Sequence, residues 1–292
     1  MRLVTLSLII CCFMLFPAQV LAVTDPLAVP NNKFGIHIID PNDLEDAAQL
    51  VNSSGGKWGY VTLVVREDER DVPRWNKIFN SMSDLHLIPI VRIASISKNG
   101  QWEKLQYSDI PNWINFLDQL NWPTVNRYIV VGNEPNHATE WGGEINPEEY
   151  AEYLKEFYSL AKIRTGDFYI LNAGFDASAP DGVGYMSEET YLHLMYQSDP
   201  DVFDYLDGWA SHSYPNPGFS GSSDDWGKGS VRTYIWELEL LDIYDVVGLP
   251  IFVTETGWAH DIDGTVLGQS DYGQDRYAFK SIDEVSVEYK NA

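Results

Sequence analysis

Two segments of the sequence each place a glutamate directly after a run of apolar residues. One reads VVGNEP over residues 130–135 and delivers Glu134, and the other reads PIFVTETGW over residues 250–258 and delivers Glu255. Apolar runs of this length are typical of strands buried on both faces. Each glutamate is therefore expected at the carboxyl end of a strand, although a helix N-cap or a loop carboxylate is the alternative for Glu134.

Two carboxylates brought together in this way could hydrolyse a glycosidic bond. A separation of roughly 5 Å suits a retaining mechanism, in which one carboxylate attacks the sugar and the other protonates the leaving oxygen. An inverting pair stands roughly 6.5–9.5 Å apart, because a water must fit between the sugar and the base. Repulsion between two close carboxylates raises the pKa of one of them, which gives the two groups different roles.

The elements that must position these glutamates alternate between strand and helix along the chain. The expected strands cover residues 34–39, 60–66, 88–94, 128–133, 168–173, 208–213 and 250–255. The expected helices cover residues 42–51, 72–83, 111–120, 148–163, 188–197, 231–245 and 272–285. The last four strands begin 40, 40 and 42 residues apart. This regular alternation favours a closed parallel barrel, and no Gly-rich phosphate loop marks the switch point of an open doubly wound sheet.

The fold class predicted is therefore α/β, a TIM-type β/α barrel. Seven β-α units are visible, whereas this barrel has eight strands. The next strand would begin near residue 291 and the sequence has 292 residues, so strand 8 and its helix are expected to be missing through C-terminal truncation. A strand supplied from elsewhere or an open barrel are the alternatives. Glu134 on the fourth strand and Glu255 on the seventh would face each other across the rim.

The two glutamate segments together resemble a known family. GNEP over residues 132–135 resembles the Asn-Glu-Pro acid/base motif of the large clan of retaining β-glycosidases whose catalytic glutamates lie on strands 4 and 7. TETGW over residues 254–258 resembles the nucleophile segment of that clan, and it is particularly similar to that of endo-β-1,3-glucanases. Xyloside-cleaving relatives carry near variants. The pair, 121 residues apart, implies that Glu134 is the acid/base and Glu255 the nucleophile.

The same resemblance implies roles for neighbouring residues. Asn133 would bind the 2-hydroxyl of the sugar. The segment ASHSYP over residues 210–215 resembles the clan's His-x-Tyr segment, so Tyr214 would hydrogen-bond the nucleophile and His212 would line the cleft. A histidine satisfied within the core is the alternative for His212.

An arginine and several tryptophans complete the expected site. Arg66, at the end of the second strand, resembles the clan arginine that keeps the nucleophile ionised, and Arg92 competes for that role because a buried arginine needs a carboxylate partner. Trp258 is expected to form the platform of the −1 subsite. Trp141 and Trp102 are candidates for stacking at outer subsites, with core packing as the alternative for both.

The composition restricts the partners. The net charge of −24 disfavours nucleic acid and anionic membrane surfaces but suits a neutral oligo- or polysaccharide. The histidines are scattered, and no metal-ligand spacing or cofactor motif is present. No Gly-x-Ser-x-Gly elbow indicates serine hydrolase chemistry.

Residues 1–22 resemble a signal peptide, with Arg2 before an apolar run and Ala22 at the expected cleavage site. Residues 23–292 would then be one secreted or periplasmic catalytic domain without a cysteine. An uncleaved membrane anchor is the alternative for this leader.

Two other functions remain open from the sequence. A truncated or degenerate barrel could bind carbohydrate without turnover, although both glutamates are retained. A transglycosylase would share the covalent intermediate and differ only in the acceptor. The residues do not specify the sugar or endo against exo action, because specificity lies in the loops.

Overall fold

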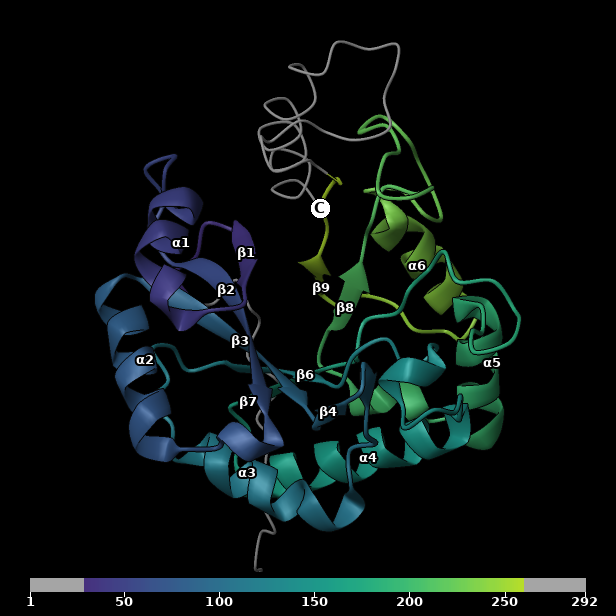
Figure 1. The fold of residues 1–292 in the computed structure, drawn as a ribbon, viewed down its shortest axis with the longest axis horizontal. Coiled ribbons are helices and arrows are strands. Elements are labelled where there is room, and N and C mark those ends of the chain that lie inside the picture. Colours follow the sequence, from purple (N-terminus) through teal and green to yellow (C-terminus); the bar gives the residue numbers. More distant parts are fainter. Residues whose placement is uncertain (1–28, 260–292) are drawn as a thin grey trace, which may run out of the picture.

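The computed structural model describes residues 29–259, and within this range parallel strands alternate with helices (Figure 1). Seven strands pair in parallel: β1 (Gly35–Ile38), β2 (Gly59–Arg66), β3 (Leu87–Ala94), β6 (Arg127–Val131), β7 (Phe168–Leu171), β8 (Trp209–His212) and β9 (Ile251–Glu255). The short β4 (Ser97–Lys98) and β5 (Gln101–Trp102) form a separate antiparallel hairpin after β3.

The helices lie outside the strands as an arc (Figure 1). They are α1 (Leu44–Val51), α2 (Val72–Asp84), α3 (Ile110–Asp118), α4 (Pro147–Arg164), α5 (Glu188–Ser198) and α6 (Thr233–Asp242). Local capping explains where they begin. In α4, for example, the Asn146 side chain accepts a hydrogen bond from the backbone of Glu149 at 3.1 Å, and Pro147 stands in the first turn.

The sheet follows the chain order expected of a barrel. Strands β1, β2, β3, β6 and β7 pair in parallel in that order, and β8 pairs with β9. Isolated bridges between Leu171 and Gly208 and between Asp176 and His212 join the β7 segment to the β8 segment, and no ladder joins β9 to β1 among the described residues. The strands nevertheless approach each other there, because His37 on β1 lies 3.5 Å from Glu255 at the end of β9.

Two apolar clusters fill the two sides of this sheet. The inner cluster lies between the strands, and its aromatic members contact each other edge-on or tilted: Tyr60, Tyr128, Tyr169 and Phe252. The larger cluster lies between the sheet and the helices and includes Trp75, Phe79 and Trp113. Strands β2, β3, β6, β7 and β8 are thus largely buried on both faces, whereas β1 and β9 are more exposed. Burial on both faces explains why β2, β3, β6 and β7 are almost continuously apolar.

The predicted β/α-barrel class is confirmed, and all seven predicted strands are present with bounds that differ by two residues or fewer. Six predicted helices are also present, although the first begins with a short 3-10 turn and the last is shorter at both ends. The leader over residues 1–22 and the helix predicted over 272–285 lie outside the described residues.

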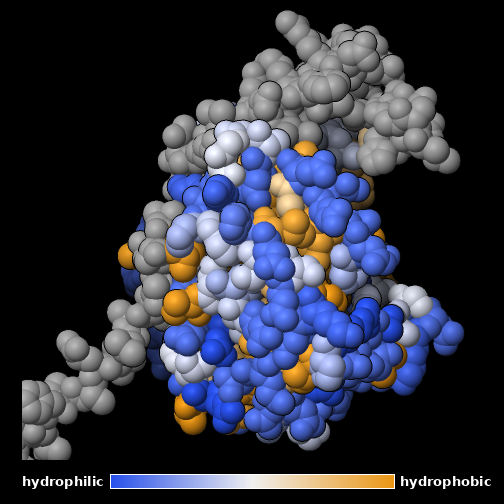
Figure 2. Space-filling view, turned by 90° about the vertical axis from the view of Figure 1, so that its left-hand side faces the viewer, coloured by the Kyte–Doolittle hydropathy of each residue, from blue (hydrophilic) through white to orange (hydrophobic). Residues whose placement is uncertain are grey.

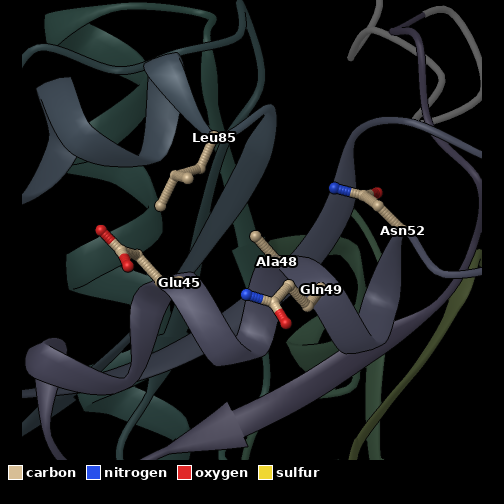
Figure 3. A pocket seen from close by; sticks show the side chains of 5 residues that line it. All are labelled: Glu45, Ala48, Gln49, Asn52 and Leu85. Carbon is tan, nitrogen blue, oxygen red and sulfur yellow. The ribbon is translucent and has the colours of Figure 1, made fainter.

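The outer surface is mainly polar. Figure 2 shows one side of the molecule as largely hydrophilic, with apolar side chains in small groups, as the net charge suggests. In the part of the chain that is described, no helix is both long and apolar enough to cross a membrane. An open hollow of about 380 Å³ lies between α1 and the end of α2, lined by Glu45, Ala48, Gln49, Asn52 and Leu85 (Figure 3). Its lining includes neither glutamate segment.

Candidate active site

The structure brings the two predicted glutamates together. Glu134 follows β6 and Glu255 ends β9, and His212 at the end of β8 lies between them. One carboxylate oxygen of each glutamate and a ring nitrogen of His212 all lie within 4.8 Å of one another. This spacing matches a pair that acts directly on a sugar rather than one that holds a water between sugar and base.

The backbone before and at Glu134 departs from ordinary strand geometry. Gly132 has a φ of 93° and Glu134 a φ of 31°, a conformation that non-glycine residues seldom adopt. The carbonyl of Glu134 accepts a hydrogen bond of 2.8 Å from the backbone of His137, which closes a turn. Non-glycine residues held in this way concentrate at functional sites, because surrounding structure must hold them there.

Arg92 is the arginine that contacts the nucleophile candidate. Its guanidinium donates to Glu255 and also to Oδ1 of Asn133, the latter at 2.6 Å. The side chain stands on β3, is only 14% exposed, and lies level with Val64 and Val130 on the neighbouring strands. It therefore reaches the rim from inside the barrel.

The preference for Arg66 over Arg92 as that arginine is wrong. Arg66 lies two residue positions nearer the rim than Arg92, level with Ala94, where β2 ends. Its side chain is 42% exposed and turns away to Asp68 at 3.1 Å and to Glu69 at 3.4 Å. The acidic turn that follows β2 thus holds Arg66 at the surface.

His212 is seated between the glutamates by two backbone features. A register shift in the β8–β9 ladder places it opposite Glu255, and its Nδ1 lies 2.7 Å from Oε1 of Glu134 and 3.8 Å from Oε2 of Glu255. Gly174 on the facing loop is required, because a Cβ there would approach Nε2 of His212 to 2.4 Å. Burial lowers the pKa of His212, but the charges of Glu255 and Glu134 outweigh burial and raise it.

Glu255 is held as a carboxylate. Burial would raise its pKa, but the charge of His212, the hydrogen bond from His37 and the charge of Arg92 outweigh burial and hold the pKa well below its usual range. The hydroxyl of Tyr214 donates to Oε2 at 3.0 Å, the contact that the resemblance predicted. Glu255 is thus an ionised, oriented carboxylate at neutral pH.

Asn133 belongs to a chain of hydrogen bonds that includes Glu140, a residue that the sequence analysis did not predict. Its Nδ2 donates to Oε2 of Glu140 at 3.1 Å while its Oδ1 accepts from Arg92, so the orientation of the amide is determined. Burial, reinforced by the charge of Glu134, raises the pKa of Glu140. Glu140 stands in a short 3-10 turn without periodicity, so nothing in the sequence distinguished it from other acidic loop residues.

A small cavity of about 70 Å³ adjoins this chain. Its lining includes Arg92, Asn133, Glu140, Trp102 and Trp141. A cavity of this size holds a few water molecules or one polar substituent, but no further sugar ring.

The three predicted binding tryptophans differ in their exposure and contacts. Trp141 is 2% exposed, packs against Tyr150 and donates to Glu149 at 2.9 Å, so stacking on an outer sugar is wrong for this residue. Trp102 is partly exposed beside the small cavity. Trp258 is partly buried, and its indole donates to the carbonyl of Gly221 at 2.8 Å, which ties it to the loop after β8.

Glu134, His212 and Glu255 also form the one group of at least three metal-ligating side chains within residues 29–259. The guanidinium of Arg92 already contacts Glu255 and opposes a cation at that carboxylate. The charge of Arg92 thus offsets the charge of Glu255.

A second carboxyl pair lies behind the site. Glu188 at the start of α5 and Glu237 on α6 are both fully buried, and Glu237 faces the side chains of Ser211 and Trp209 on β8. Burial, and for Glu188 also the charge of Glu237, raises both pKa values above their ordinary range. The pair is therefore most stable when it carries a proton.

Replacing Glu237 with glutamine is expected to flatten the dependence of stability on pH. Because a raised pKa in the folded state favours folding below the unfolded pKa and loses that advantage as pH rises through the folded pKa, the wild type should weaken towards alkaline pH. Glu237→Gln should gain about 1–2 kcal/mol over the wild type by about pH 9, relative to about pH 5. Guanidinium unfolding at these two pH values measures the difference.

Glu239→Gln is the matched control, because Glu239 stands on the same helix and is exposed. It should leave the pH slope unchanged. Equal destabilisation of Glu237→Gln at both pH values would contradict a shared proton.

Comparison with known proteins places the fold but not a family. No protein-family model matches the chain, and no curated protein matches it. Among solved structures, a GH39 β-xylosidase from Caulobacter crescentus is similar with a TM-score of 0.54 and 12% identity, over 77% of this chain and 53% of that one.

Two further structures give the same result. A monomeric β-xylosidase from Caulobacter crescentus CB15 has a TM-score of 0.52 and 13% identity, over 77% of this chain and 52% of that one. A family 51 α-L-arabinofuranosidase from Bifidobacterium longum has a TM-score of 0.51 and 13% identity, over 79% and 57%. The chain spans just over half the length of these proteins. At such identities the likeness shows that the chain has the β/α-barrel fold of these glycosidase structures.

Proposed function

We propose that this protein is a retaining glycoside hydrolase that cleaves β-linked glycans by double displacement, with Glu134 as acid/base and Glu255 as nucleophile. The observation that carries the proposal is the pair itself: two carboxylates within 4.8 Å at the ends of β6 and β9, of which Glu255 is held ionised by Arg92, His212 and His37. The similar solved structures, which are glycosidases on the same fold, support it.

In the first step, the Glu255 carboxylate forms a bond to the anomeric carbon as the bond to the leaving oxygen breaks. Glu134 gives its proton to that oxygen, so the leaving group departs as a neutral alcohol. Tyr214 and Arg92 keep Glu255 in one orientation throughout. Asn133, its amide oriented by Arg92 and Glu140, lies beside the pair, where the resemblance assigns it to the sugar 2-hydroxyl.

In the second step, Glu134 takes a proton from water as the water oxygen attacks the same carbon and the bond to Glu255 breaks. The configuration at the anomeric carbon is therefore retained. We place the substrate among neutral oligo- or polysaccharides, since the chain is strongly acidic. With residues 1–22 as a signal peptide, the enzyme would meet such glycans outside the cytoplasm.

The test is covalent labelling of the intact protein. A panel of 2-deoxy-2-fluoro-β-glycosyl fluorides of glucose, xylose and mannose is incubated with the wild type and with Glu255→Gln. Mass spectrometry is expected to find one added sugar on the peptide that contains Glu255. The fluorine at C2 slows both steps, but the good leaving group at the anomeric carbon, fluoride, keeps formation of the intermediate faster than its breakdown. The sugar that labels names the substrate class.

Glu255→Gln should remain unlabelled under the same conditions. Labelling of another residue would contradict the assignment of the nucleophile. A folded wild type that neither labels nor hydrolyses any of the three sugars would favour a barrel that binds carbohydrate without turnover.

A further inference from the structure

The loop after β7 meets the loop that carries Glu134. The backbone nitrogen of Ala138 donates to the carbonyl of Gly184 at 3.0 Å, and His137 forms an antiparallel bridge with Tyr185. His137 is in turn bound to the carbonyl of Glu134 through its own backbone. Tyr185 is therefore fixed to the acid/base segment rather than carried on a separate loop tip.

Tyr185 packs against the His137 ring but remains partly exposed to solvent. Its ring meets the His137 ring edge-on, with centroids 4.8 Å apart and an interplanar angle of 83°. Nε2 of His137 is bound to Oδ2 of Asp176 at 2.9 Å, which fixes the imidazole. Tyr185 nonetheless keeps 46% of its surface exposed, so an aromatic ring supported by His137 is open to solvent.

The role proposed for Glu134 indicates which part of a substrate would lie next to Tyr185. An acid that protonates the leaving oxygen must stand on the side from which the leaving group departs. The surface attached to the Glu134 segment is therefore the candidate contact for the leaving group rather than for the sugar that becomes bound to Glu255. An exposed ring in this place offers a flat apolar surface to the C–H face of a sugar.

The charged side chains around this ring favour a neutral sugar over an anionic one. Asp176, Glu140 and Glu134 lie around His137, and with burial opposing them they raise its pKa. A uronate or sulfated sugar would meet these carboxylates and be repelled. The surface suits a neutral sugar.

We propose that Tyr185, supported by His137, is the stacking platform for the first neutral sugar of the leaving group. The protein then acts on saccharide chains rather than on glycosides of small alcohols. This inference rests on the proposed function and assigns a residue that contacts the leaving group, for which the proposed function names none.

The test compares two leaving groups on one glycosyl unit. The sugar that labels Glu255 is supplied as its β-glycosyl fluoride and as the corresponding β-linked tetrasaccharide, and Tyr185→Ala is compared with the wild type. We expect kcat/KM for the tetrasaccharide to fall about tenfold or more, since one aromatic contact is lost. For the fluoride, which carries no second sugar, kcat/KM should stay within about twofold.

A second readout separates stacking from a structural role. The same sugar platform should receive an acceptor sugar, so Tyr185→Ala should lower the ratio of transfer to hydrolysis when the glycosyl fluoride reacts in the presence of a free disaccharide. Tyr185→Phe keeps the ring and should retain both the tetrasaccharide rate and the transfer ratio. Val183→Ala is the loop control, because Val183 is fully exposed on the same loop.

Each outcome has one meaning. Equal loss on both substrates, or no loss on either, would overturn the platform while covalent labelling of Glu255 upheld the proposed function. A wild type that labels nothing and turns over neither substrate would overturn both. Thermal unfolding of each variant shows whether Tyr185→Ala remains folded.

Discussion

Replacing Glu255 with alanine is expected to reduce kcat/KM by about 10⁴-fold or more, which corresponds to roughly 5 kcal/mol of transition-state stabilisation. The variant loses the attacking carboxylate and also the charge that Arg92, His212 and Tyr214 surround. No other described carboxylate contacts both Arg92 and Tyr214. Steady-state kinetics on an aryl β-glycoside of the labelling sugar measures the loss.

Addition of azide to Glu255→Ala should restore part of the rate, because a small anion fits the space that the side chain leaves. The product should be the α-glycosyl azide, formed by a single inversion. Recovery of a β-azide would show that another residue had formed the glycosyl-enzyme.

Glu255→Gln should also unfold more readily than the wild type, since Arg92 then lacks a charged partner.

The second large effect is expected at Glu134 and depends on the leaving group. Glu134→Ala should lower kcat/KM by about 10²–10⁴-fold on an oligosaccharide, whose leaving oxygen needs a proton. On a 2,4-dinitrophenyl glycoside, whose leaving oxygen departs as a stable anion, the first step should be almost unaffected. The measurement is a plot of rate against leaving-group pKa, which should be steeper for the variant.

Azide again distinguishes the roles. In Glu134→Ala it attacks the glycosyl-enzyme from the open face, so the product should be the β-glycosyl azide. Glu140→Gln is the control on the same loop: it disturbs Asn133, which donates to Glu140 at 3.1 Å, and should slow all leaving groups to the same extent. An unchanged slope in Glu134→Ala would contradict its role as acid.

The strands and both glutamates could be predicted from the sequence because their signals are local. Strands β2, β3, β6 and β7 are largely buried on both faces and appear as nearly continuous apolar runs, and each glutamate lies within three residues of the last apolar residue of a strand. Parallel strands all present their carboxyl ends on one rim, which is sufficient to bring Glu134 and Glu255 together once the strand count is correct.

The choice between Arg66 and Arg92 needed strand register, which the sequence does not contain. Both arginines stand on apolar strands and project from the same face, two levels apart. Only the paired register shows that Arg92 lies beneath the rim. The acidic turn after β2, which holds Arg66 at the surface, is visible in the sequence, but its effect depends on that same register.

Residues around the candidate site also lie in segments without periodicity. Glu140 and Tyr185 stand in short turns, and Trp141 is buried because α4 packs over it through Tyr150 and Tyr153. Exposure of a loop residue depends on its tertiary contacts, so a tryptophan in the core and a tyrosine at the rim give the same local signal.

The partners of Glu255 come from widely separated parts of the chain. Arg92 lies 163 positions away, while Tyr214 lies 41 positions away. Bringing such distant positions together has an entropic cost that must be met before the contacts can repay it, and parallel pairing adds to that delay during folding. The environment that keeps Glu255 ionised is therefore a property of the finished polypeptide topology. No short contiguous fragment contains these partners, and the carboxylate acquires its surroundings only when the early and late halves of the chain have met.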